Sequence, residues 1–156
     1  MRSSMSEKVV LLVEDNSSDE ALARRALGKH GFSGALVVAR DGAEALDYLF
    51  DTDGSAGDEV KPLPQLILLD LKLPKLSGID VLCRLRAEQR TRSIPVVIWT
   101  SSAEEEDLLA GYCGGCNSYL RKPVDFVQFS EALGKVAAYW LDLNLPPPHK
   151  LEPLAS

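Results

Sequence analysis

The fold of this chain is indicated most clearly by the segment Leu66-Ile67-Leu68-Leu69-Asp70-Leu71-Lys72-Leu73-Pro74. Four bulky apolar residues run without polar alternation into a single carboxylate, and Pro74 closes the segment. Such a run is typical of a strand covered on both faces of a parallel sheet, where ligands bind beyond the carboxyl ends of the strands. We therefore predict a central buried strand with Asp70 at its functional end. The alternative, for Asp70 taken alone, is an Asp that only begins a turn.

The composition fits one globular domain. The chain has 156 residues, of which 46% are apolar and 26% charged, and a chain of this length buries about two thirds of its unfolded surface. The net charge is −6 and no basic run reaches five residues, so we expect no direct nucleic-acid partner. No apolar stretch is long enough to span a bilayer, and the N-terminus lacks the apolar core of a signal peptide. The lack of these two segments, together with an odd cysteine count of three, favours a cytoplasmic protein without a membrane partner.

Apolar strands and amphipathic helices alternate along the chain. We predict strands over residues 8–13, 35–39, 66–69, 94–99 and 117–121. We predict a first helix from Ser17, which forms a capping box with Glu20, to Gly31, and a second over residues 42–50. A third helix is expected after Gly78, and a fourth from Ser102 with acids in its first turn. An apolar stripe from Phe126 to Trp140 predicts the fifth.

Strict alternation of strands and helices implies a doubly wound parallel sheet with right-handed crossovers and helices on both faces. We predict one domain over residues 8–141, with a polar surface loop at 51–64. Residues 1–7 are expected to be a flexible N-terminus. Residues 142–156, rich in Leu and Pro, are expected to form an extension without an output domain.

Polar residues stand at the ends of four of the predicted strands. Glu14 and Asp15 follow the first, Asp70 the third, Thr100 the fourth and Lys122 the fifth. Because the carboxyl ends of parallel strands share one edge of the sheet, these groups are expected to meet in one crevice.

Three carboxylates in one crevice indicate a cation site. Two carboxylates about 4 Å apart repel by roughly 4 kcal/mol at an effective dielectric of 20, and a divalent cation reverses this into attraction. An all-oxygen site without His or Cys points to Mg²⁺. With the cation and Lys122 neutralising the phosphoryl oxygens, Asp70 can attack phosphorus and become an acyl phosphate, while Thr100 binds one phosphoryl oxygen.

These residues resemble the pattern of receiver domains of two-component response regulators. That pattern has an acidic pair after strand one, a phosphoaccepting Asp after strand three, Thr or Ser after strand four and Lys-Pro after strand five. Here these are Glu14-Asp15, Asp70, Thr100 and Lys122-Pro123, and the resemblance covers residues 8–141. It implies the flavodoxin-like receiver fold with strand order 2-1-3-4-5. It also implies a phosphorylation switch that accepts a phosphoryl group from a histidine kinase and is not an enzyme in the usual sense.

The resemblance also implies roles for individual residues. Asp15, Asp70 and the backbone carbonyl of Lys72 would bind Mg²⁺, for which Mn²⁺ or Ca²⁺ can substitute, and Glu14 would act mostly through water. The peptide bond between Lys122 and Pro123 would be cis. Tyr119 takes the position of an aromatic residue that turns inward when Thr100 moves toward the phosphoryl group. The alternative for Tyr119 is simple packing in a strand.

Lys72 and Ser102 are the variable positions of this resemblance. Lys72 stands two residues after the phosphoacceptor, where many receivers carry Asn or another residue, and Ser102 stands two residues after Thr100. Both are expected to affect the lifetime of the acyl phosphate. Ser101 is small enough to leave the phosphoryl group accessible.

A narrower likeness concerns single-domain receivers that partner bacterial and cyanobacterial phytochromes, which are red-light-sensing histidine kinases. It is carried by Arg40-Asp41-Gly42, the segment 68–74, Ile94-Pro95-Val96-Val97, Trp140-Leu141 and Leu145-Pro146. It implies a phytochrome-type kinase as the phosphoryl donor and a homodimer formed with help from residues 142–156. The alternative for this extension is a disordered tail.

Other functions lack a residue that they require. Phosphatases similar to haloacid dehalogenases also use an Asp nucleophile with Mg²⁺, but they need an acidic residue where this chain has Lys72. Nucleotide-binding glycine motifs are absent after the first strand. Cys113 and Cys116 have redox-motif spacing, but they do not open a helix, so we predict no redox role. His30 and His149 are isolated in the sequence and are not expected to bind a ligand.

Overall fold

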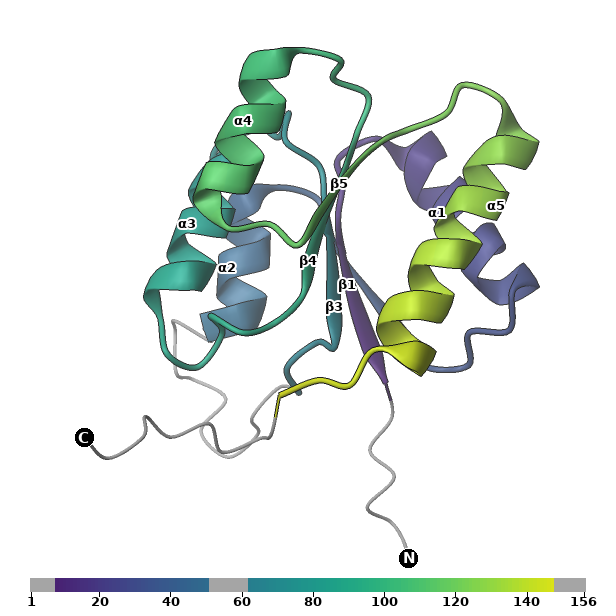
Figure 1. Ribbon diagram of the computed structural model, residues 1–156, viewed down its shortest axis with the longest axis horizontal. Helices are drawn as coiled ribbons and strands as arrows, with labels where there is room; N and C mark the ends of the chain where they lie inside the picture. Colours follow the sequence, from purple (N-terminus) through teal and green to yellow (C-terminus); the bar gives the residue numbers. More distant parts are fainter. Residues whose placement is uncertain (1–7, 51–61, 148–156) are drawn as a thin grey trace, which may run out of the picture.

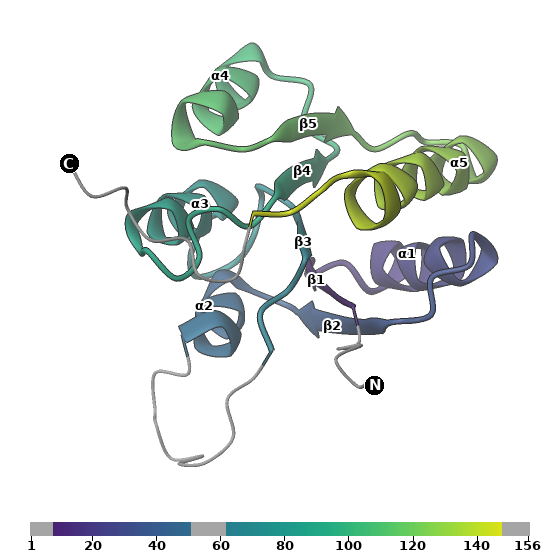
Figure 2. The same ribbon diagram turned by 60° about the horizontal axis from the view of Figure 1, so that its bottom comes forward.

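A parallel sheet lies between two layers of helices in the computed structural model of the protein, which describes residues 8–50 and 62–147 (Figure 1). The sheet has five strands in the order β2-β1-β3-β4-β5, all parallel. In chain order the elements are β1 (Val9–Val13), α1 (Ser17–Lys29), β2 (Ala35–Ala39), α2 (Gly42–Phe50), β3 (Leu66–Leu69), α3 (Gly78–Ala87), β4 (Val96–Thr100), α4 (Glu105–Gly114), β5 (Ser118–Arg121), α5 (Phe126–Ala137) and the π-helix η1 (Ala138–Leu143). Figure 2 shows α2, α3 and α4 on one face and α1 and α5 on the other. The predicted doubly wound fold and strand order are confirmed.

Each face of the sheet has its own apolar core because successive side chains of a strand point to opposite faces. In β3, Ile67 and Leu69 pack toward α2 and α3, while Leu66 and Leu68 pack toward α1 and α5. All four are fully buried, and burial of each such side chain contributes about 1.5–3 kcal/mol. The unbroken apolar run of β3 is therefore explained by helices on both of its faces.

Helix α1 begins at Ser17 as predicted but its cap differs, and the start of α4 differs as well. The N-cap of α1 is Asn16, whose side chain accepts a hydrogen bond from the Asp19 N–H, so the predicted Ser17 capping box is wrong. The predicted start of α4 at Ser102 is also wrong, because its hydroxyl donates to Asp107 and accepts from the Glu104 N–H, and the helix begins after this turn.

Strand β4 begins at Val96 instead of the predicted residue 94. Pro95 has no N–H to donate to a sheet ladder, which explains the later start. The predicted strands over residues 8–13 and 117–121 are each one residue shorter in the structure, and the helix over 42–50 is confirmed at both ends.

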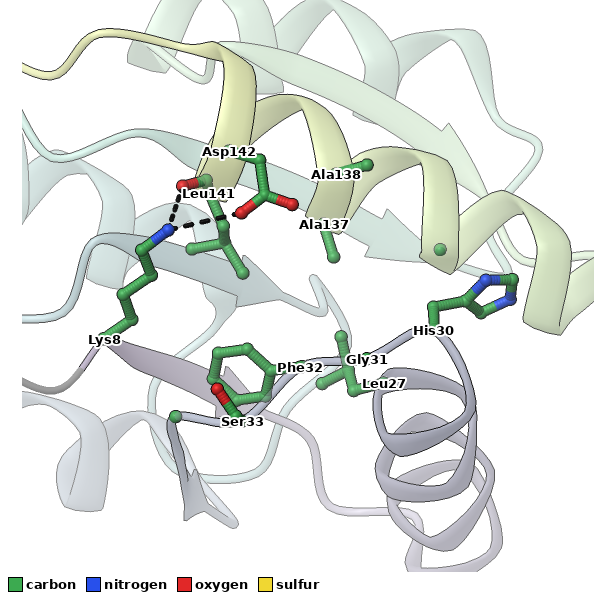
Figure 3. Close-up of a pocket in the computed structure, with 12 residues that line it drawn as sticks. Lys8, Leu27, His30, Gly31, Phe32, Ser33, Ala137, Ala138, Leu141 and Asp142 are labelled. Carbon is green, nitrogen blue, oxygen red and sulfur yellow. Dashed lines mark hydrogen bonds and ion pairs between the residues drawn. The ribbon is translucent and has the colours of Figure 1, made fainter.

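The C-terminal end of α5 is tied to the start of β1. Beyond Ala137 the helix continues as η1, and the Lys8 ammonium donates to the Leu141 carbonyl at 2.6 Å and to Asp142 at 3.2 Å. A cavity of about 310 Å³ lies beside this contact, between the C-terminal ends of α1 and α5 (Figure 3). Leu141 is buried in the same core as the apolar residues of α5.

Three of the predicted segments lie wholly or partly outside the described residues. These are the N-terminus at 1–7, most of the loop at 51–64, and the C-terminal extension beyond residue 147. In the described part of the chain, no helix combines the length and the apolar character that crossing a membrane requires.

Candidate functional site

The carboxyl ends of β1, β3, β4 and β5 bring the predicted residues together. The strands are in register, with Val13 beside Leu69 and Leu69 beside Ile98. The pairing continues one residue further, because the Asp70 N–H donates to the Val13 carbonyl at 3.1 Å and the Lys122 N–H donates to the Thr100 carbonyl at 2.7 Å. Residues far apart in the chain therefore meet at one edge of the sheet.

Glu14, Asp15 and Asp70 form an acidic cluster. One carboxylate oxygen of each lies within 4.8 Å of those of the other two. Glu14 and Asp70 are buried, whereas Asp15 is exposed and leaves the cluster open on one side. Hard oxygen ligands at this spacing fit a divalent cation of the Mg²⁺ type. Among the described residues, this is the one group of three or more His, Cys, Asp or Glu side chains close enough to share a metal ion.

Lys122 brings a positive charge into this cluster. Its ammonium lies 2.5 Å from a Glu14 oxygen, 2.7 Å from an Asp19 oxygen and 3.0 Å from an Asp70 oxygen, and its side chain is 6% exposed. Burial alone would lower the pKa of Lys122, but hydrogen bonds to Asp19 and Glu14 and the charge of Asp70 outweigh burial and raise it. The side chain therefore stays positively charged at neutral pH.

The peptide bond between Lys122 and Pro123 is trans, since the described residues contain no cis peptide bond. The prediction of a cis bond was wrong. A trans bond before proline is favoured by about 0.5–1 kcal/mol. In the trans form the Lys122 ammonium already reaches Asp70, so contact with the acids does not require the cis isomer.

Glu14 is the acid most changed by its surroundings. Burial raises the pKa of Glu14 from 4.5 to about 7; the hydrogen bond from Lys122 opposes this rise and the charge of Asp70 adds to it. The Asn16 N–H also donates to Glu14 at 3.1 Å. Glu14 therefore titrates near neutral pH when no cation is bound.

Thr100 and Tyr119, the predicted switch pair, lie on adjacent strands. Thr100 is fully buried, and its hydroxyl oxygen accepts a hydrogen bond from the Ser102 N–H at 3.3 Å. The Tyr119 ring packs beside Gly111 of α4, where an added Cβ would lie 3.1 Å from the ring. The Tyr119 hydroxyl is buried and has no hydrogen-bond partner among the residues that the structure describes. The switch itself stays a prediction.

Lys72 and Ser102 meet at one acid of α4. The Lys72 ammonium lies 3.7 Å from a carboxylate oxygen of Asp107, and the Ser102 hydroxyl donates to that carboxylate at 2.5 Å. The Ser102 hydrogen bond lowers the pKa of Asp107, so this acid stays charged. The loops after β3 and β4 are therefore linked through the first turn of α4.

Sequence reasoning missed Asp19 as a member of the site. It stands in the first turn of α1, where an acid is explained equally well by the helix dipole. No local pattern distinguishes a dipole-stabilising acid from a partner of a distant lysine.

The remaining candidates lie away from this site. Cys113 is exposed in the last turn of α4 and Cys116 is buried, and both are free thiols. Burial raises the pKa of Cys116, which makes it a poor thiolate nucleophile. His30 caps the C-terminus of α1 and lines the cavity at the opposite end of the sheet, and His149 lies outside the described residues.

Comparison with known proteins identifies a family model and close relatives. Residues 10–134 match the family model described as "Response regulator receiver domain". The chain is 40% identical to "Probable methanogenesis regulatory protein FilR2" of Methanothrix harundinacea, over 89% of this chain and 87% of the relative. It is 35% identical to "Response regulator Rcp1" of Synechocystis, over 89% of this chain and 93% of the relative.

Solved structures of response regulators also resemble this chain. The phosphorylated cyanobacterial phytochrome response regulator RcpA superposes with a TM-score of 0.83 and 33% identity, over 92% of this chain and all of the other. The Mn²⁺-bound form of Rcp1 superposes with a TM-score of 0.80 and 34% identity, over 90% and 99%. The bacteriophytochrome response regulator RtBRR superposes with a TM-score of 0.70 and 45% identity, over 92% and 86%.

Proposed function

The chain belongs to the response regulator receiver domain family, and from this premise we propose that it is a phosphorylation switch with Asp70 as phosphoacceptor. The observation that carries the proposal is the contact of the Lys122 ammonium with Asp70 beside the acidic cluster. This edge of the sheet combines a nucleophile, a fixed positive charge and a set of oxygen ligands for a cation. These are the requirements of phosphoryl transfer.

Each side chain has a defined part in the proposed reaction. A carboxylate oxygen of Asp70 forms a bond to the phosphorus of a phosphohistidine, the P–N bond breaks, and the departing imidazole takes a proton. The Lys122 ammonium neutralises negative charge on the phosphoryl oxygens, and the Thr100 hydroxyl donates a hydrogen bond to one of them. The domain catalyses its own phosphorylation and the later hydrolysis of the acyl phosphate, without acting on a separate substrate.

The cation of this reaction is proposed to be Mg²⁺. Asp15, Asp70 and the backbone carbonyl of Lys72 would hold it, with Glu14 acting mostly through water, and Mn²⁺ or Ca²⁺ could take its place. When bound, the cation supplies positive charge that offsets the charge of the phosphoryl oxygens. The fit of the acidic cluster and the Mn²⁺-bound form of Rcp1 support this assignment.

Two pairs of residues are proposed to act after phosphorylation. Movement of Thr100 toward the phosphoryl group would change the position of Tyr119 and so alter the surface formed by α4, β5 and α5. Lys72 and Ser102, which both contact Asp107, would affect the lifetime of the acyl phosphate, and the Lys72 side chain would do so by lying near the path of the attacking water.

The phosphoryl donor is proposed to be a phytochrome-type histidine kinase in the cytoplasm. Two of the similar structures are a cyanobacterial phytochrome response regulator and a bacteriophytochrome response regulator. A pull-down with the phytochrome-type kinases of the same cell, in light and in darkness, tests this partner. Capture by none of these kinases in either condition would contradict it.

A homodimer through residues 142–156 is the second partner proposal. In the described part of this extension, Leu143 and Leu145 are 71% and 90% exposed, which is unfavourable for a monomer. Sedimentation of the full chain tests it, with Leu143→Asp and Leu145→Asp combined in one variant. The variant should sediment as a monomer. An unchanged profile would exclude these leucines from the interface.

The principal experiment is transfer of radiolabelled phosphate from acetyl phosphate. We expect one Mg²⁺-dependent label per chain, stable in acid and labile in base, as is characteristic of an acyl phosphate. The label should be lost in Asp70→Asn and retained in Glu131→Gln, which changes an exposed acid of α5. Turnover of many equivalents of a phosphate ester would instead indicate a phosphatase similar to haloacid dehalogenases.

A further inference from the structure

Within residues 8–50 and 62–147, Asp19 is the one carboxylate partner of Lys122 that lies outside the acidic cluster. Lys122 contacts Glu14, Asp19 and Asp70, whereas the cluster that can share a cation consists of Glu14, Asp15 and Asp70. Two of the three partners of the ammonium are therefore also candidate ligands of the cation. Asp19 alone among them serves only the ammonium.

The ammonium and a divalent cation compete for the same oxygens. A cation that binds Glu14 or Asp70 takes a negatively charged partner away from Lys122, and its positive charge also repels the ammonium. Lys122 is nearly fully buried, and a buried ammonium without a charged partner is strongly unfavourable. Binding of the cation therefore requires that Lys122 keep a carboxylate that the cation does not use.

Asp19 meets this requirement. It lies in the first turn of α1, where the helix dipole favours a negative charge. Its backbone is held by the Asn16 cap, and its carboxylate is 2.7 Å from the ammonium. The exposed fraction of its side chain is 27%, so Asp19 is better hydrated than Glu14 and Asp70.

We propose that Asp19 is a positioning residue that holds Lys122 when the cation occupies the acidic cluster. It lowers the cost of cation binding and keeps the ammonium beside Asp70, where the phosphoryl group will form. This inference rests on the proposed function, because it assumes that the cluster binds a divalent cation. Asp19 itself touches neither the cation nor the phosphoryl group.

Calorimetric titration of the full chain with Mn²⁺, without a phosphoryl donor, tests the proposal. Asp19→Asn should raise the dissociation constant by about tenfold, as expected when one partner of a largely buried charge pair is removed. Asp19→Glu should restore most of the affinity. The matched control is Glu20→Gln, which removes an acid from the same helical turn but breaks contacts only with Arg24 and Arg40, and it should bind Mn²⁺ like the native chain.

A double-mutant cycle separates action through Lys122 from a simple change of charge. In a Lys122→Met background there is no ammonium to hold, so Asp19→Asn should weaken binding about fivefold less than it does in the native background. Equal losses in both backgrounds, or no loss in the native background, would overturn the proposal. If the native chain binds Mn²⁺ no more tightly than Asp15→Asn does, the proposed function itself fails, which is a different outcome.

Discussion

The ammonium nitrogen of Lys122 lies 3.0 Å from a carboxylate oxygen of Asp70, although the two residues are 52 positions apart in the chain. Strand β4 separates the strands that carry them, so the Lys122 side chain reaches across the end of β4. Four acids, Glu14, Asp15, Asp19 and Asp70, surround or adjoin this single ammonium. The site is therefore short of positive charge until a cation binds.

The charge imbalance predicts that Asp70→Asn stabilises the cation-free protein. Removing one of the crowded carboxylates relieves repulsion, while the Asn oxygen can still accept from Lys122. We expect a gain of about 1 kcal/mol in the free energy of unfolding, or a few degrees in Tm. In thermal unfolding, a cation at about 100 times its dissociation constant should stabilise the native chain by about 2.7 kcal/mol and the variant much less. An equal Mg²⁺ shift in both proteins would show that Asp70 is not a ligand.

Gly78→Ala is expected to damage both the fold and the site. A Cβ at Gly78 would lie 2.3 Å from the Asp70 carbonyl oxygen and 2.8 Å from the Leu71 Cα, so the backbone of the phosphoacceptor must shift. We expect a loss of roughly 2–4 kcal/mol in urea unfolding and slower labelling by acetyl phosphate.

Gly28→Ala is the matched control for Gly78→Ala. Apart from its chain neighbours and the backbone of its own helix, no described residue has an atom within 4 Å of an added Cβ at this helical position. The change should therefore stabilise α1 by about 0.5–1 kcal/mol. Similar losses in the two variants would contradict the assignment of the Gly78 effect to its contact with Asp70.

The raised pKa of Glu14 predicts the pH dependence of stability without a cation. The unfolded chain loses the Glu14 proton near pH 4.5, whereas the folded chain holds it to about pH 7. Between these values the folded state binds more protons, so the contribution of Glu14 to the free energy of unfolding falls as pH rises and is constant above that range.

Glu14→Gln should abolish this contribution. Relative to the variant, the native chain should lose up to about 3 kcal/mol between pH 4.5 and pH 7, measured by urea unfolding in EDTA. Glu131→Gln, at an exposed position of α5, should keep the native dependence. Parallel curves for the native chain and Glu14→Gln would contradict the raised pKa.

The hydrogen bonds of Arg86 predict that Arg86→Lys destabilises the fold although it conserves the charge. Its guanidinium donates to the carbonyls of Gly115, Arg92 and Ile94 and to the Asn117 side chain, and so joins α3 to the start of β4 and to the α4–β5 loop. Lysine cannot make this planar set of contacts, so Arg86→Lys should lower the free energy of unfolding by roughly 1–3 kcal/mol.

Arg84→Lys is the control for Arg86→Lys on the same helix. Arg84 is exposed, pairs with Glu88 at 3.4 Å and lies over the Phe50 ring. Such surface contacts contribute little, and we expect a change below about 0.5 kcal/mol in chemical denaturation. A comparable loss at both positions would mean that the hydrogen bonds of Arg86 to the backbone and to Asn117 are not responsible.

The sequence determined the order of the elements and the residues at the strand ends. Apolar runs such as residues 66–69 and the spacing of apolar residues in α5 are local patterns, and alternation with short connections leaves few possible sheets. Once the strands are known to be parallel, Glu14, Asp70, Thr100 and Lys122 must lie at one edge.

Only the tertiary structure decided which of these groups touch and which other residues join them. Asp19 and Lys122 are 103 positions apart and Arg86 and Gly115 are 29 apart, and no local pattern relates such pairs. Short-range preferences select helices and strands, whereas the contacts of a buried charge are selected by the packing that excludes water around it.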